Sequence, residues 1–122
     1  MSFTDTLTQI TEKIEGATAA IILGIDGIPI ERHAADLDPS LDIEMVATEL
    51  TTLLRRGMHT ASDTALGELL EMVLATERMT FLLRPITSEY FLLLAVGPGG
   101  NVGRARFELR KAQLALEEEF AI

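Results

Sequence analysis

The sequence has 122 residues, of which 48% are hydrophobic, and a formal net charge of −9 at pH 7. We expect a single domain over residues 1–122, and a domain of this size buries about two-thirds of the surface of its unfolded chain. The negative charge argues against nucleic acid and anionic membrane surfaces as partners, because their phosphates would be repelled. The absence of cysteine excludes disulfides, thiolate metal sites and thiol nucleophiles.

The apolar content is high for so small a domain, so we expect part of it at an interface between chains. With five phenylalanines, one tyrosine and no tryptophan, the core must be aliphatic. The longest apolar run, residues 91–96, is too short to span a bilayer, and no membrane insertion is expected. No apolar signal segment opens the sequence, so the expected location is the cytoplasm.

The first predicted element is a helix. Ser2 is placed to cap it, apolar residues recur at helical spacing from Phe3 to Ile14, and Gly16 is placed to end it. Two strand-like runs, about 18–26 and 28–34, then flank Asp26-Gly27, a dipeptide typical of tight hairpins. Proline cannot donate to a sheet ladder, so Pro29 predicts an edge strand.

A long helix is predicted over about 42–62, with Ser40 placed to cap it. Its apolar residues cover more than one narrow stripe, with an additional flank at Ala47, Leu54, Met58 and Ala61. Either the core wraps around this helix or a second chain covers the flank. The second explanation fits the surplus of apolar residues.

Three strands are predicted next, over residues 68–76, 79–85 and 90–96. The last is apolar on both faces, which predicts a central position in a sheet covered on both sides. A final helix over about 102–119 follows, with Asn101 as its cap. Its lysine and arginines lie between positions 104 and 111, and residues 117–119, at its C-terminal end, are glutamates. This order opposes the helix dipole. This order indicates either a solvated face or a charge pattern that serves something other than the helix.

The chain offers few groups for catalysis. His33 and His59 have no histidine or cysteine at ligand spacing, and no nucleophile motif accompanies them, so we expect no metal, no cofactor and no enzymatic activity. The glycine-rich segment 97–103 leads into a helix and could bind phosphate, but it matches neither common phosphate-loop pattern. A plain connection between strand and helix is the simpler interpretation.

One polar strip lies on the long helix, on the side that we expect to face away from the main apolar stripe. A solvated helix face and a protein-docking surface both explain it, and its threonines would permit close approach of a partner. Its members are Thr48, Thr51, Thr52, Arg55, Arg56 and His59.

The order of predicted elements and three segments resemble the roadblock/dynein light chain family. Residues 14–30, with their Asp-Gly-Ile-Pro hairpin, resemble its opening segment, and 69–85 resemble its third and fourth strands. Residues 102–111 resemble the closing helix of its prokaryotic, MglB-like branch. The resemblance covers nearly the whole chain.

The resemblance implies an α+β sandwich of three layers, in the order α-β-β-α-β-β-β-α. One long helix would cover one face of a five-stranded antiparallel sheet, and the first and last helices would cover the other. It further implies a homodimer, made by pairing the long helix and third strand with their copies. Two such dimers could pair into a tetramer. The expected dimer residues are Ala47, Leu54, Met58, Leu70, Met72 and Leu74.

The resemblance also implies a function: regulation of a small Ras-like GTPase, which would dock on the paired long helices. The six residues of the polar strip are the expected docking residues, and neither arginine is assigned as an arginine finger. Two alternatives remain open at this point. The chain could be a structural subunit of a larger assembly, or it could be a module that senses a small ligand held between its layers.

Overall fold

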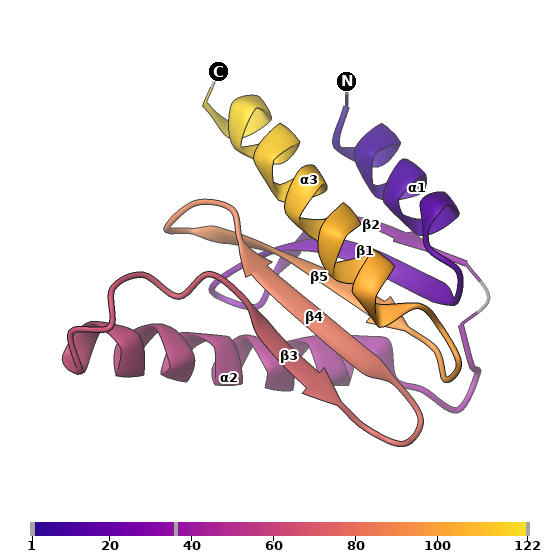
Figure 1. The fold of residues 1–122 in the computed structure, drawn as a ribbon, viewed down its shortest axis with the longest axis horizontal. Coiled ribbons are helices and arrows are strands. Elements are labelled where there is room, and N and C mark those ends of the chain that lie inside the picture. The colour runs from indigo at the N-terminus through magenta and orange to yellow at the C-terminus, as the bar shows by residue number, and fades with distance from the viewer. Residues whose placement is uncertain (1, 36, 122) are drawn as a thin grey trace.

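The computed structural model describes residues 2–35 and 37–121. Its three helices and five strands follow one another in the order that the sequence predicted (Figure 1). They are α1 (Phe3–Lys13), β1 (Ala17–Gly24), β2 (Pro29–Ala34), α2 (Ile43–Asp63), β3 (Met72–Ala75), β4 (Thr80–Pro85), β5 (Tyr90–Val96) and α3 (Val102–Phe120).

The strands form one antiparallel sheet in the order β2-β1-β5-β4-β3. The apolar strand β5 is central, as predicted, and β2 with Pro29 lies at an edge. Helix α2 crosses one face of the sheet, while α1 and α3 lie side by side on the other (Figure 1). The predicted three-layer α+β architecture is therefore confirmed.

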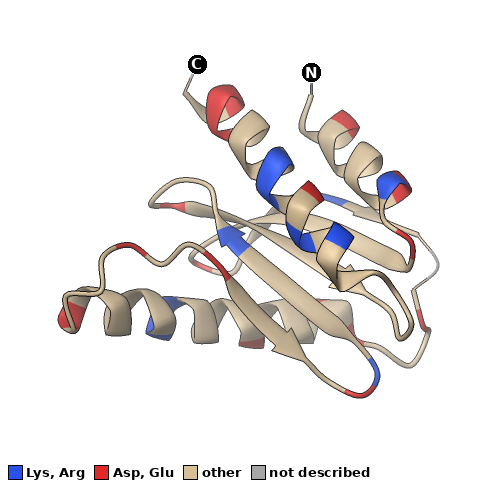
Figure 2. Cartoon of the chain, in the orientation of Figure 1, with Lys and Arg blue, Asp and Glu red and all other residues tan. Residues whose placement is uncertain are grey.

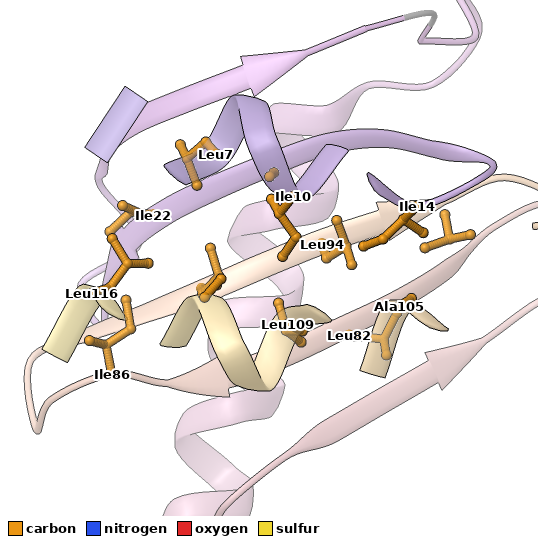
Figure 3. Packing of buried hydrophobic residues seen from close by; sticks show 14 residues of the cluster. Leu7, Ile10, Ile14, Ile22, Leu82, Ile86, Leu94, Ala105, Leu109 and Leu116 are labelled. Carbon is orange, nitrogen blue, oxygen red and sulfur yellow. The ribbon is translucent and has the colours of Figure 1, made fainter. Parts of the chain in front are cut away.

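Each face of the sheet has its own hydrophobic core, because successive side chains of a strand point to opposite faces. Leu92 and Leu94 of β5 pack under α1 and α3, together with Leu109 of α3 (Figure 3). Leu93, between them in the chain, faces α2 and contributes to a second cluster with Leu54. The central strand thus serves both cores.

Two of the three predicted N-terminal cap residues are confirmed by the structure. Ser2 Oγ accepts from the Asp5 amide at 3.2 Å, and Asn101 Oδ1 accepts from the Arg104 amide at 2.9 Å. The prediction that Ser40 caps α2 is wrong. Asp42 caps this helix, because it directly precedes the first helical residue, and its carboxylate accepts from Met45 at 3.1 Å.

Strand β3 is shorter than the predicted 68–76. Its ladder with β4 begins at the pair Met72–Leu83, and residues 67–71 are irregular. Continuing the antiparallel register would bring Leu70 opposite Pro85. Proline has no N–H to donate, so the ladder has no support beyond this point.

Candidate protein-docking surface

Five of the six predicted docking residues lie exposed on α2: Thr48, Thr52, Arg55, Arg56 and His59. We call these five the α2 strip. Arg55 Nη1 donates to the carbonyl of Ile25 at 3.1 Å, which joins the strip to the β1–β2 turn. The Thr48 hydroxyl donates to the Glu44 carbonyl one turn earlier, at 3.0 Å. The strip is thus a polar surface with methyl groups and two guanidinium groups, one of which is hydrogen-bonded to the protein.

Thr51 does not belong to the strip, and its predicted position on the exposed side is wrong. Its side chain is 2% exposed, and its hydroxyl donates to the Ala47 carbonyl at 2.7 Å. Residues 47, 51 and 54 are spaced at i, i+4 and i+7, so they share the face that packs on the sheet. The inward face of α2 is therefore wider than its aliphatic residues alone suggested.

Two predicted dimer residues of α2, Ala47 and Leu54, are also buried, against the sheet of their own chain. For them the structure corrects the prediction, because the core covers this flank and a second chain cannot reach it. Ala61 is buried as well, and Met58 is partly buried against the same cluster. Of the three predicted residues around β3, Leu70 and Leu74 are exposed and Met72 is partly buried.

An open groove of about 800 Å³ lies beside the α2 strip. Met45 and Leu53 line it from α2 and Leu74 lines it from β3, and all three are exposed apolar side chains. Neither Met45 nor Leu53 was among the predicted dimer residues. The signal was the spacing of eight residues between them, which places both near one side of a helix.

The groove ends at a strand edge without a partner in the described part of the chain. β3 is last in the strand order and pairs only with β4. Val73 and Leu74 are exposed on this strand. An exposed apolar edge strand is a ready template for pairing with another chain.

A polar cluster contributes Asp38 and Arg78 to the lining of the groove. The Arg78 guanidinium, in the β3–β4 turn, donates to Asp38 Oδ2 at 2.7 Å and to Ser40 Oγ at 2.6 Å. Hydrogen bonds from the backbone and side chain of Ser40, and then from Arg78, hold the pKa of the Asp38 carboxyl below its ordinary value. This cluster ties the β3–β4 turn to the segment that precedes α2.

The glycine-rich segment 97–103 connects β5 to α3, and several of its amides are bonded to the protein itself. Gly97 N donates to the Gly16 carbonyl at 2.8 Å, and Asn101 N donates to the Glu15 carbonyl at 3.2 Å. Gly100 N donates to Gly97 within the segment at 3.1 Å. Three amides of the segment are thus bonded to protein carbonyls, which favours the interpretation as a connection.

The described residues contain no group of three or more His, Cys, Asp or Glu side chains that could hold a metal ion. His33 Nδ1 lies 3.4 Å from the Thr8 hydroxyl, across the β2–α1 contact, and His59 belongs to the α2 strip. Across the same residues, every helix is too short or too polar to cross a membrane.

Comparisons with known proteins give matches among solved structures. No family model and no curated protein matches the sequence. MglC from Myxococcus xanthus is similar, with 29% identity, a TM-score of 0.70, and 98% of this chain and 99% of that chain covered. A Roadblock/LC7 domain from Streptomyces avermitilis has 15% identity and a TM-score of 0.84 over 100% of both chains. An MglB with tetrameric arrangement has 18% identity, a TM-score of 0.84, and 97% and 88% of the two chains covered.

The fold, with one long helix opposite two shorter ones across a five-stranded sheet, is that of roadblock/LC7 domains. The chain thus has the roadblock/LC7 fold and is similar to the solved MglC and MglB structures.

Proposed function

We propose that this protein is a dimeric regulator of a small Ras-like GTPase, which docks on the α2 strip of the paired chains. The observation that carries the proposal is the arrangement on α2. An exposed polar strip lies beside an apolar groove that ends at an unpaired strand edge. The family resemblance supplies the kind of partner.

The dimer would form through the groove and the edge of β3. Formation of the interface would remove three apolar side chains from water: Met45, Leu53 and Leu74. Strand β3 would also gain hydrogen-bonding partners from its copy. This assignment keeps Leu70, Met72 and Leu74 near the interface and replaces Ala47 and Leu54 by Met45 and Leu53. Two such dimers could further pair into a tetramer, and a solved MglB has a tetrameric arrangement.

The α2 strip would then lie on both chains beside the two-fold axis, as a continuous platform. Thr48 and Thr52 offer small side chains that allow a partner backbone to come close, and Arg55, Arg56 and His59 offer hydrogen-bond donors. Because Arg55 is already bound to the Ile25 carbonyl, it serves as a positioned docking group. We assign no arginine finger.

In this mechanism the regulator contributes no catalytic residue of its own. Docking would hold the mobile loops of the GTPase in the geometry that its own water-positioning and Mg²⁺-binding groups require. The acceleration would come from preorganisation in the partner.

The decisive experiment is single-turnover GTP hydrolysis by each small Ras-like GTPase of the source genome, with this protein titrated in. Saturable acceleration of one GTPase would establish an activating regulator. Tighter binding to one nucleotide state without acceleration would indicate a scaffold that reads the state of the GTPase. No effect of either kind would favour a structural subunit of a larger assembly.

Two neighbouring threonines provide matched variants for this experiment. Thr52→Glu places a charge on the exposed strip, and we expect it to weaken GTPase binding at least about tenfold with the dimer intact. Thr51→Val removes a buried hydroxyl one residue away and should leave binding unchanged. Equal effects of the two variants would place the docking surface elsewhere.

A ligand-sensing role has less support. Two hollows of the described surface, of about 830 and 800 Å³, are open clefts. The first extends from the end of α2 over residues 67–70 to α3, and the second lies between α2 and β3. The buried side chains on both faces of the sheet are predominantly aliphatic.

A further inference from the structure

The outer face of α3 presents apolar side chains that the core does not use. Ala105, Leu109 and Leu116 form its buried stripe. Phe107 and Leu114 point the other way and are 58% and 52% exposed. They are seven residues apart, so they lie on nearly the same side of the helix, two turns apart.

Cations are concentrated around these two residues. Four of the ten lysines and arginines of the chain lie between positions 104 and 111, in a protein whose net charge is −9 (Figure 2). Arg104 pairs with Glu108 at 2.9 Å and Arg106 with Glu71 at 2.7 Å. Arg110 and Lys111 have no ion-pair partner among residues 2–35 and 37–121.

Two of these cations lie close to the aromatic ring of Phe107. Arg104 Cζ lies 5.9 Å and Lys111 Nζ lies 5.7 Å from the ring centroid. Both distances are within the range of cation–π attraction. Phe107, Arg110, Lys111 and Leu114 therefore form one exposed patch that is both apolar and basic, which we call the α3 patch.

The charges of α3 are not arranged for the stability of the helix. The first turn contains no acidic residue and the last turn contains no basic one, while glutamates occupy 117–119. A helix is stabilised by the opposite order. The basic half of α3 is therefore better explained by an interaction outside the helix.

The α3 patch lies on the face of the sheet opposite α2 (Figure 1). It would stay accessible when the α2 strip and the groove are covered, so it is independent of the proposed GTPase and dimer contacts. We propose that the α3 patch binds an acidic amphipathic segment of another protein. An apolar side chain of that segment would pack on Phe107 and Leu114, and its carboxylates would pair with Arg110 and Lys111.

Two other occupants fit the patch less well. A second copy paired antiparallel on α3, with Phe107 opposite Leu114, would bring Arg110 of each copy against Lys111 of the other, near the two-fold axis. An anionic membrane would meet two unpaired cations together with the glutamates at 117–119, on a protein of net negative charge.

The test uses a fluorescein-labelled helical peptide of about 18 residues, long enough to form a helix, in which leucine recurs every third or fourth position among glutamates and alanines. We expect saturable anisotropy with the full chain. Lys111→Glu should weaken binding by about tenfold, because it turns attraction into repulsion. Lys13→Glu, the same charge change on α1, should have no effect. A peptide with lysine in place of glutamate should not bind.

Three results would overturn the proposal. One is no binding of the acidic peptide, or equal binding by wild type and Lys111→Glu. Another is binding to phosphatidylserine vesicles that Lys111→Glu abolishes, which would assign the patch to a membrane. The third is that the wild type forms an oligomer larger than a dimer and that Lys111→Glu dissociates this larger oligomer. That result would assign the patch to a second copy. Circular dichroism of each variant checks that α3 is intact.

Discussion

Gly16 and Gly100 meet backbone to backbone at the start of β1. A Cβ atom on Gly16 would lie 2.7 Å from Gly100 Cα, and one on Gly100 would lie 2.3 Å from Val96 Cγ1. Gly16 also has a φ of +87°, which favours glycine. This contact lets segment 97–101 bond to Glu15 and Gly16 in the turn between α1 and β1, close to where α3 begins.

The close contact makes Gly16 costly to replace. We expect Gly16→Ala to lower the free energy of unfolding by about 2–4 kcal/mol, because left-handed backbone strain and a steric overlap add. Gly99→Ala is the matched control, since Gly99 has a φ of +81° with nothing within 4 Å of a Cβ. It should cost only about 1 kcal/mol. Urea denaturation measures both, and equal losses would show that the backbone contact contributes nothing.

Gln113 connects β4 to α3 beneath the surface. It is buried, Arg84 Nε donates to its Oε1 at 2.9 Å, and its Nε2 donates to Glu117. Gln113→Met keeps the volume but leaves Arg84 Nε and Glu117 without this partner. We expect a loss of about 1–3 kcal/mol in the free energy of unfolding. Gln9→Met, on the exposed side of α1, should stay within about 0.5 kcal/mol, and a similar loss there would contradict the role of Gln113.

Asp38 should respond to acid. Its pKa is lower in the folded protein than its ordinary value, so its contacts add stability above the unfolded pKa, and this stability is lost as the pH falls through the folded pKa. A ¹³C NMR titration of the Asp38 carboxyl should show the lowered pKa. Ser40→Ala and Arg78→Ala should each raise it, and neither should restore the ordinary value, because the Ser40 backbone N–H is the largest cause and remains. An unchanged pKa in both variants would contradict the cluster.

The sequence was sufficient for the order of elements and for the placement of β5. Hydrophobic periodicity identifies helices and strands directly, and consecutive apolar residues such as Leu92 and Leu93 require cover on both faces. It was also sufficient for the caps at Ser2 and Asn101, because capping is a local interaction.

The sequence was not sufficient for the boundary of the buried face of α2. Thr51 lies inside that boundary and Leu53 outside it, although their polarity suggests the reverse. The boundary depends on how the helix axis lies across a twisted sheet, which is a property of the whole fold. The late start of β3 likewise depends on Pro85, which is distant in sequence and would lie opposite residue 70 in the register.

The dimer proposal makes a prediction about two leucines that face the same groove. Leu53 and Leu74 are each 40% exposed, on α2 and β3. A charge at either site would have to leave water when the interface forms, and a two-fold interface contains every substitution twice. We therefore expect Leu53→Glu and Leu74→Glu each to weaken dimerisation at least about a hundredfold.

Sedimentation equilibrium of the wild type and the variants measures this effect. Leu114→Glu is the matched control, because Leu114 is equally accessible but lies on α3, across the sheet from the groove. It should leave the dimer unchanged. A monomeric wild type would refute the dimer itself, whereas a dimer that survives both groove variants would move the interface away from α2 and β3. If only Leu114→Glu dissociated the protein, the chains would associate through α3, and the α2 strips would not form one platform.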